Sequence, residues 1–169
     1  MADLQGQVAL VTGASRGIGS VIAQYLGEAG VNVGVNYLAS EDAASRVVDS
    51  VTKAGAEAVL VPADVSQEAE AQAAIKQVVD RWGRIDILVN NAGITRDKLL
   101  LRMNVEDWDR VLDVDLRGAF LCTKYVMPHL IRQRQGRVVN IASVVGIGGN
   151  PGQANYAAAK AGLIGFTKA

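Results

Sequence analysis

The chain has 169 residues, half of them hydrophobic, which is the size of one domain with a buried core. Seventeen Lys and Arg residues balance seventeen Asp and Glu residues, so the net charge favours neither a nucleic-acid partner nor an anionic membrane surface. A single cysteine, Cys122, rules out an intrachain disulfide, and one thiol with one histidine, His129, predicts no metal site.

The first segment, MADLQGQVALVTG, lacks the basic and apolar regions of a signal peptide. No stretch of the sequence is apolar for long enough to span a bilayer. We therefore expect a cytoplasmic protein without a membrane partner.

Short apolar runs alternate with longer amphipathic runs along the chain. The apolar runs, rich in Val and Ile, predict strands at 8–11, 31–35, 58–61, 85–89 and 137–141. The amphipathic runs predict helices at 17–29, 42–54, 67–82 and 105–134. This alternation predicts an α/β fold with a doubly wound parallel sheet, Rossmann-like or flavodoxin-like, in strand order 3-2-1-4-5. We expect one dinucleotide-binding domain over residues 1–169.

Several residues mark where the predicted helices begin and end. Gly30, Gly55 and Gly83 each follow a helical run and predict its end. Asn104 predicts the start of the fourth helix. Pro128 lies inside that helix and is expected to kink or shorten it.

A glycine-rich turn, TGASRGIG at residues 12–19, joins the first predicted strand to the first predicted helix. Gly13, Gly17 and Gly19 would let the backbone approach a pyrophosphate, and the helix N-terminus would supply amide donors. Because the turn lies between a strand and a helix, it predicts a dinucleotide site. The alternative is a tight turn whose glycines serve packing alone.

The end of the second predicted strand indicates which dinucleotide is bound. NAD sites of this type usually carry a carboxylate there for the ribose 2'-hydroxyl, but this chain has Asn36 and Tyr37, with no acid before Glu41. Arg16, inside the glycine turn, could pair with a 2'-phosphate. We expect NADP(H) as the cofactor; a solvated surface charge is the alternative role for Arg16.

Polar residues also follow the third and fourth predicted strands. Asp64 could accept a hydrogen bond from an adenine amino group, or it could cap the helix that begins near Ser66. Asn91 belongs to NNAG at residues 90–93, which would lie at the carboxyl edge of the sheet, where ligands bind. A simple turn is the alternative for that motif.

Three polar side chains towards the C-terminus suit the reduction of a carbonyl group. Ser143 follows the fifth predicted strand, and Tyr156 and Lys160 share one helix face at positions i and i+4. A free phenol, with a pKa of about 10, exchanges its proton poorly near neutral pH unless an ammonium favours the phenolate. We predict Tyr156 as the acid, Lys160 as its cationic partner and a ligand of the nicotinamide ribose, and Ser143 as a donor to the carbonyl oxygen. The predicted cofactor-binding residues are Gly13, Ser15, Arg16, Gly17, Ile18, Gly19, Asn36, Asp64, Val65, Asn91, Ala92, Gly93, Tyr156 and Lys160.

Four motifs taken together, TGASRGIG, NNAGITRD, NIASVVG and GQANYAAAKAGLIGFTKA, resemble the short-chain dehydrogenase/reductase family, and within it the 3-oxoacyl-[acyl-carrier-protein] reductases. The resemblance implies NADPH-dependent reduction of a 3-oxoacyl thioester, with Ser143, Tyr156 and Lys160 as catalytic residues. Arg134, in RQRQGR, resembles a site that meets the acidic carrier protein. The alternative for Arg134 is a cation favoured by the helix dipole.

The sequence departs from the family pattern at Asp115. Where the family usually has asparagine in a VNLxG-like stretch, this chain reads VDLRG. The resemblance places Asp115 in the catalytic set, because that asparagine is thought to hold a water in a proton relay to the lysine. A carboxylate adds a charge that could pair with Lys160 and change the protonation of both groups together. We expect reduced or pH-shifted turnover.

Members of the family also continue past the helix that carries Tyr156 and Lys160. They add two more strands and a segment that covers the nicotinamide and the substrate. We therefore expect a truncated form of the family fold, in which an apolar edge strand at 137–141 favours a homo-oligomer, most simply a dimer.

Three functions fit the sequence. The first is NADPH-dependent reduction of an acyl thioester, carried by acyl-carrier protein or free, with weak or no turnover. The second is a non-catalytic nucleotide-binding module, and the third is a minimal flavodoxin-like scaffold with vestigial motifs. The glycine turn supports the first two over the third. Asp115 and the absence of a covering segment support the last two over the first.

Overall fold

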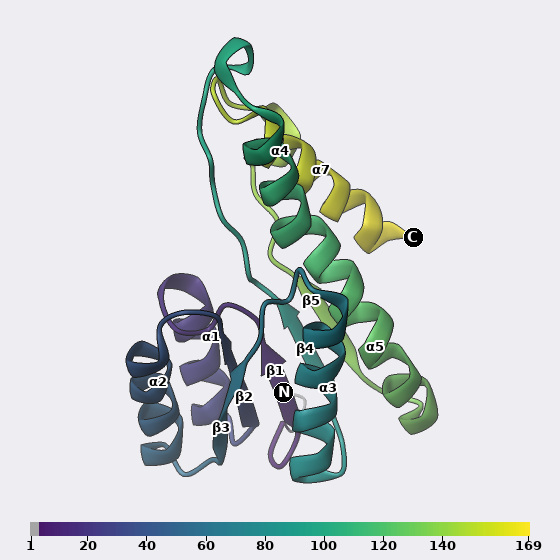
Figure 1. Ribbon diagram of the computed structural model, residues 1–169. Coiled ribbons are helices and arrows are strands. Elements are labelled where there is room, and N and C mark those ends of the chain that lie inside the picture. The colour runs from purple at the N-terminus through teal and green to yellow at the C-terminus, as the bar shows by residue number, and fades with distance from the viewer. Residues whose placement is uncertain (1–3) are drawn as a thin grey trace.

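The computed structural model describes residues 4–169 and contains a five-stranded parallel sheet with helices on both faces (Figure 1). The strand order is β3-β2-β1-β4-β5, which confirms the predicted fold class and order. The strands are β1 (Val8–Val11), β2 (Asn32–Tyr37), β3 (Ala58–Pro62), β4 (Ile87–Asn90) and β5 (Arg137–Asn140). The second strand runs two residues further than predicted, so Asn36 and Tyr37 belong to the sheet and not to the loop after it.

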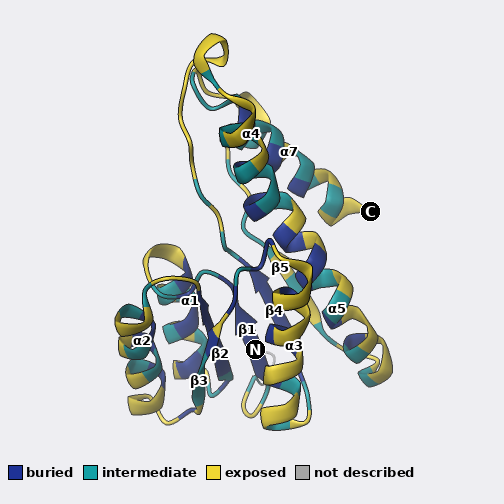
Figure 2. Ribbon diagram, viewed as in Figure 1, coloured by how far each residue is buried: buried dark blue, intermediate teal, exposed yellow. Residues whose placement is uncertain are grey.

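Two hydrophobic clusters form the core, one on each face of the sheet. On one face, α1 (Gly17–Glu28) and α2 (Glu41–Lys53) cover Ala9, Val11, Val33 and Val35. On the other face, α3 (Glu68–Trp82) and α5 (Gly118–Gln133) pack against β1, β3 and β4. Figure 2 shows the central strands β1, β2 and β4 buried between these layers. Cys122 lies in the second cluster, where burial raises the pKa of its thiol to about 12, so the thiol is a core group and not a nucleophile.

The long segment predicted as one helix at 105–134 consists of three parts. It begins as α4 (Val105–Leu112), continues through a single π turn, η2 (Asp113–Arg117), and ends as α5. The π turn closes with a hydrogen bond from Gly118 N to Asp113 O. Pro128 lies inside α5, which continues to Gln133, so the irregularity lies at η2 and the proline does not end the helix.

The start and stop signals of the helices are confirmed. Gly30, Gly55 and Gly83 have positive φ angles of 80°, 96° and 72° within two residues of the ends of α1, α2 and α3. Asn104 caps α4, because its Oδ1 accepts a hydrogen bond of 2.7 Å from Asp107 N.

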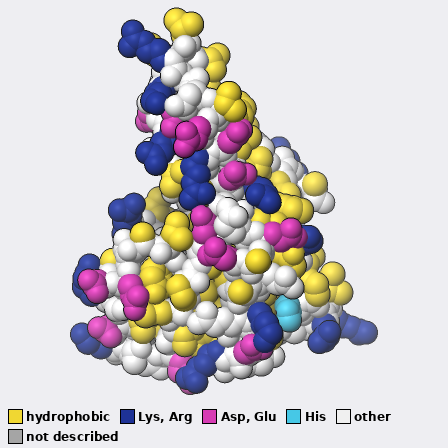
Figure 3. All heavy atoms as spheres, in the orientation of Figure 1, with side chains coloured by type: hydrophobic (Ala, Val, Ile, Leu, Met, Phe, Trp, Pro, Cys, Tyr) yellow, Lys and Arg dark blue, Asp and Glu magenta, His cyan; other side chains and the backbone are white. Residues whose placement is uncertain are grey.

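An arm extends beyond the carboxyl ends of the strands. It consists of α4, the turn η1 (Leu100–Arg102), the short α6 (Val145–Gly148) and α7 (Ala154–Lys168), with α4 and α7 packed side by side (Figure 1). Leu99, Leu100 and Leu101 are exposed at the tip of this arm. The face shown in Figure 3 carries charges of both signs without a large patch of either. Among residues 4–169, no helix is long and apolar enough to cross a membrane.

Strand β5 forms one edge of the sheet, and its two valines have different surroundings. Val138 packs against the cluster beneath α3 and α5, whereas Val139 is 44% exposed. The edge strand therefore presents both an unpaired backbone and an apolar side chain to its surroundings.

Gly19, in the first turn of α1, offers a test of how closely the glycine turn is packed. An added Cβ would overlap Nδ2 of Asn91 and lie 2.6 Å from the carbonyl oxygen of Gly13. We expect Gly19→Ala to lower the free energy of unfolding by about 1–3 kcal/mol, measured by urea denaturation.

Gly165 in α7 is the matched control, because no neighbouring atom lies within 4 Å of an added Cβ there. Gly165→Ala should raise the free energy of unfolding by about 0.5–1 kcal/mol through helix propensity alone. Equal stability of the two variants would contradict the packing argument.

Candidate active site at the carboxyl edge of the sheet

The glycine turn is held to the sheet by the side chain of Asn36. Its Oδ1 accepts a hydrogen bond of 3.0 Å from Gly13 N, and its Nδ2 donates to the carbonyl oxygens of Val61 and Ala63 at 3.0 and 3.1 Å. The residue is buried, and its amide group joins β2 to β3 and to the turn. Asn36 therefore shapes the site through hydrogen bonds within the protein, and a contact between Asn36 and a cofactor stays a prediction.

Thr12 and Asn91 join the glycine turn to the NNAG segment. The Thr12 hydroxyl accepts hydrogen bonds from the backbone N–H groups of Asn91 and Ala92, both at 2.9 Å. In return, Asn91 Nδ2 donates to the carbonyl oxygens of Thr12 and Gly13 at 2.9 and 3.1 Å. The asparagine after β4 thus has a structural partner, and it is not an ordinary surface turn residue.

Gly13 makes a close approach that requires glycine. Its φ is 60°, and an added Cβ would lie 2.9 Å from Cα of Ala92. The two predicted motifs are therefore packed backbone to backbone.

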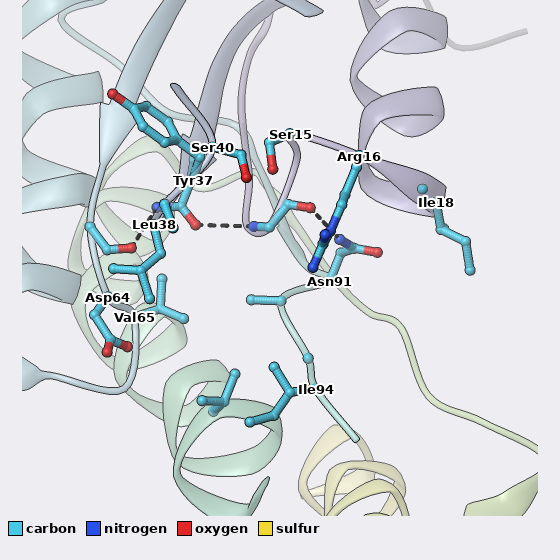
Figure 4. A pocket seen from close by; sticks show the side chains of 18 of the residues that line it. Ser15, Arg16, Ile18, Tyr37, Leu38, Ser40, Asp64, Val65, Asn91 and Ile94 are labelled. Carbon is cyan, nitrogen blue, oxygen red and sulfur yellow. Dashed lines mark hydrogen bonds between the residues drawn. The ribbon is translucent and has the colours of Figure 1, made fainter. Parts of the chain in front are cut away.

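The first cavity, of about 450 Å³, opens beside the glycine turn and extends to the end of β3. Figure 4 shows Arg16 and Ile18 at one side of it and Asp64 and Val65 at the other. The predicted cofactor residues that line this cavity are Gly13, Ser15, Arg16, Gly17, Ile18, Asn36, Asp64, Val65, Asn91, Ala92 and Gly93. Gly19 does not line the cavity, because it is buried beneath the turn.

The second cavity, of about 540 Å³, adjoins the first along the carboxyl ends of the strands. Both cavities are lined by Arg16, Ile18, Asn91, Gly93 and Ile94. The walls of the second cavity also include Asp115, Tyr156 and Lys160. The tertiary structure therefore brings the glycine turn and the predicted Tyr–Lys pair to one continuous edge.

Ser143 is the predicted catalytic residue that does not line either cavity. Its Oγ accepts a hydrogen bond of 3.2 Å from Val145 N at the start of α6. The serine after β5 closes a short turn with Val145 and directly follows Ala142, which lines the second cavity, and its catalytic role stays a prediction.

Lys160 is buried between three partners from different elements. Its Nζ donates a hydrogen bond of 3.0 Å to the carbonyl oxygen of Ile141 and lies 3.3 Å from Asp115 Oδ2. The same Nζ lies 5.5 Å from the centroid of the Tyr156 ring, within cation–π range. Because the Lys160 side chain is only 5% exposed, its charge acts in a poorly screened environment.

Asp115, on the π turn, connects this lysine to the segment after β4. Its Oδ1 accepts a hydrogen bond of 2.8 Å from Ile94 N. Its Oδ2 faces Lys160 without the alignment of a hydrogen bond, so the attraction between these two groups is mainly coulombic. Burial raises the pKa of the Asp115 carboxyl, and the Ile94 amide and the Lys160 ammonium offset this only in part.

Two residues of the site were missed by the sequence analysis. Asn155 is buried, and its Nδ2 donates to the carbonyl oxygens of Arg96 and Asp107, both at 3.1 Å, so it ties α7 to α4 and to the segment after β4. Arg110 of α4 lines the first cavity and pairs with Asp64. An asparagine before the tyrosine was a weak signal for the first, and an arginine on an amphipathic helix gave no signal for the second.

Asp64 does not cap the following helix. The helix α3 begins at Glu68, whereas Oδ1 of Asp64 accepts hydrogen bonds from Ser66 N and Ser66 Oγ at 3.0 and 2.6 Å. The capping alternative for Asp64 is therefore wrong, because its carboxylate closes a short turn before the helix starts.

Comparison with known proteins shows the family of the chain. The sequence model of the family described as short chain dehydrogenase matches residues 7–169. The chain belongs to the short-chain dehydrogenase family. Within residues that align, it is 56% identical to a 3-oxoacyl-[acyl-carrier-protein] reductase of Synechocystis sp. over 168 residues, which cover 99% of this chain and 68% of that relative. It is 52% identical over 160 residues to the 3-oxoacyl-[acyl-carrier-protein] reductase FabG of Staphylococcus epidermidis, covering 95% of this chain and 66% of the relative.

Among solved structures, this chain resembles a putative short-chain alcohol dehydrogenase from Sinorhizobium meliloti. The TM-score is 0.94 at 35% sequence identity, covering 98% of this chain and 65% of that chain. The chain thus spans about two thirds of the length of these relatives.

The raised pKa of Asp115 predicts how stability depends on pH. The folded chain holds this proton more tightly than the unfolded chain, so the stability that Asp115 contributes is complete below its unfolded pKa and is lost as pH rises through its folded pKa. Asp115→Asn cannot lose stability in this way. The difference in Tm, variant minus parent, should therefore increase from about pH 4 to neutral pH, measured by circular dichroism.

Asp113→Asn removes a carboxylate that is 45% exposed from the same π turn and controls for the change in net charge. A Tm difference for Asp115→Asn that stays constant or falls as pH rises would show that burial does not raise the pKa of the Asp115 carboxyl.

Proposed function

We propose that this chain binds NADP(H) along the two adjoining cavities and reduces the ketone of a 3-oxoacyl thioester. The observation that carries the proposal is the placement of the glycine turn and the Tyr156–Lys160 pair on one edge of the sheet, with shared walls between the cavities. The printed activity of the Synechocystis and Staphylococcus relatives, 3-oxoacyl-[acyl-carrier-protein] reductase, supports the same substrate class.

The residues around the first cavity fit a dinucleotide with a 2'-phosphate. Glycines at the turn leave the backbone bare next to the N-terminus of α1, which suits a pyrophosphate. The end of β2 carries Asn36 and Tyr37 where an NAD site would have an acid. Arg16 is exposed and lines both cavities, so its guanidinium can meet a phosphate.

The residues of the second cavity suit proton transfer to a carbonyl oxygen. When bound, NADPH supplies the hydride. Tyr156 donates its Oη proton to the carbonyl oxygen as negative charge develops there, and the Lys160 ammonium stabilises the resulting phenolate. Ser143 Oγ accepts from Val145 N, which leaves its own hydrogen free to donate to the same carbonyl oxygen.

A nucleotide-binding module with little or no turnover is the second candidate, and the Asp115–Lys160 pair favours it. A carboxylate 3.3 Å from Nζ balances part of the positive charge that Tyr156 depends on. The proposed chemistry therefore needs Lys160 to act against a competing buried anion.

Arg134 has a definite structural role, and its carrier-protein contact is a proposal. It ends α5 in a left-handed conformation, with φ of 55°, just before β5 begins. It therefore lies at the amino end of the sheet, opposite the cavities. We propose that Arg134 meets an acidic acyl-carrier protein that delivers its thioester to the cavity of another copy in a homo-oligomer.

The homo-oligomer itself is proposed from the exposed apolar surface of β5 and α5. Val139 on β5 and Phe120, Met127 and Ile131 on α5 are between 39% and 66% exposed. We expect light scattering with size-exclusion chromatography to report a particle of two chains. Met127→Lys with Ile131→Lys should shift it towards the monomer, and a monodisperse parent monomer would contradict the proposal.

Titration of the chain with NADPH and NADH, followed by nicotinamide fluorescence, tests the cofactor assignment. We expect saturable binding that prefers NADPH. Arg16→Ala should weaken NADPH binding roughly tenfold and leave NADH binding nearly unchanged, because only the 2'-phosphate pairs with the guanidinium.

Arg132→Ala is the matched control, because it removes an exposed arginine from α5 that lines neither cavity. Equal loss of NADPH affinity in both arginine variants would show a general charge effect. No saturable binding of either nucleotide to the parent chain would overturn the proposed function and favour the scaffold.

A further inference from the structure

Arg110 of α4 reaches across to the turn between β3 and α3. Its Nη2 donates a hydrogen bond of 3.1 Å to Asp64 Oδ2, and its Nη1 donates one of 3.1 Å to Ser66 Oγ. The two nitrogens of one planar guanidinium thus hold a carboxylate and a hydroxyl at the same time. Because Ser66 is fully buried, this turn is anchored and not a freely moving loop.

The hydrogen bonds of Asp64 leave one acceptor position unused. Oδ1 accepts from both Ser66 N and Ser66 Oγ, whereas Oδ2 accepts only from Arg110. An ionised carboxylate offers about four acceptor positions, two on each oxygen, so the remaining one is on Oδ2. Burial would raise the pKa of Asp64, but its bonds with Ser66 and Arg110 lower it below the usual value, which keeps the group an acceptor at neutral pH.

The Asp64 side chain remains 15% exposed and lines the first cavity, at the side away from Arg16 (Figure 4). A ligand group that approaches Oδ2 from the cavity must therefore be a hydrogen-bond donor. We propose that Arg110 is a positioning residue, which holds Asp64 in one orientation so that Oδ2 accepts from the exocyclic amino group of an adenine. This inference rests on the proposed binding of NADP(H) and adds to it the residue that sets selectivity for the base.

The same helical segment packs closely on this turn at two further points. Arg117, on the π turn, donates a hydrogen bond of 3.3 Å to the carbonyl oxygen of Ser66. Gly118 allows α5 to approach, because an added Cβ would lie 3.1 Å from Cγ2 of Val65. Arg110 is thus one of two arginines that bind the turn, but of the two only Arg110 contacts the carboxylate.

The test compares NADPH with its hypoxanthine analogue, in which an oxo group replaces the amino group of the base. Both can be titrated by nicotinamide fluorescence. The parent chain should prefer NADPH on the order of tenfold, because the oxo group is an acceptor and faces a carboxylate. Arg110→Gln should reduce the ratio of NADPH affinity to analogue affinity by at least roughly threefold, because the Asp64 carboxylate and the Ser66 hydroxyl lose the guanidinium that orients them.

Three further variants separate positioning from general structure. Arg117→Gln loses a bond to the same turn without touching Asp64, and it should keep the parent ratio. Arg110→Lys retains the charge but only one donor nitrogen, so its affinity ratio should lie between those of Arg110→Gln and the parent. Asp64→Asn exchanges an acceptor for a donor at the cavity, which should bring the ratio to about one or below.

An unchanged ratio in Arg110→Gln would overturn the inference, even if both nucleotides bound more weakly, because a merely structural role affects both equally. If circular dichroism shows that Arg110→Gln is unfolded, the affinity ratios of Arg110→Lys and Asp64→Asn test the inference instead. Parent-like ratios in both variants would overturn it. A parent chain that binds both nucleotides equally would overturn the inference alone. A parent chain that binds neither would overturn the proposed function, and the inference with it.

Discussion

Where the parallel strands end, their backbone groups leave the hydrogen-bond ladder and must find other partners, because a buried polar group without a partner is strongly destabilising. In this chain, side chains provide those partners at nearly every strand. Asn36 and Thr12 bind the amides of the glycine turn and of the segment after β4. Asp115 accepts from Ile94 N, and Lys160 donates to Ile141 O after β5. The floor of both cavities is built from these bonds.

Asp115 has two roles: its side chain provides a partner for the Ile94 amide, and its charge lies beside Lys160. An asparagine could accept from Ile94 N as well as an aspartate does, so the backbone bond alone does not distinguish the two residues. The carboxylate adds a negative charge 3.3 Å from Lys160, and both side chains are nearly or fully buried. Desolvation opposes that charge, whereas the lysine supports it, and the raised pKa shows that desolvation has the larger effect.

One helical segment, from α4 through the π turn to α5, contacts both ends of the site. Arg110 binds Asp64 beside the first cavity, and Asp115 faces Lys160 beside the second. The π turn inserts an extra residue per turn between α4 and α5, which changes the direction of every side chain that follows. Asp115 lies within this π turn, where its Oδ1 accepts the hydrogen bond from Ile94 N.

The sequence by itself determined the features that follow from local residue patterns and from the general rules of chain connection. These are the strand order, which follows from alternating periods and right-handed crossovers, the glycine turn, and the shared helix face of Tyr156 and Lys160. Only the tertiary structure decided the π turn, the turn bond of Ser143, the buried bonds of Asn155 and the pairing of Arg110 with Asp64. The last pair is separated by 46 residues. From the sequence, an arginine on an amphipathic helix is predicted to be a surface residue. Periodicity does not indicate which distant loop packs against that helix, so it could not predict the contact with Asp64.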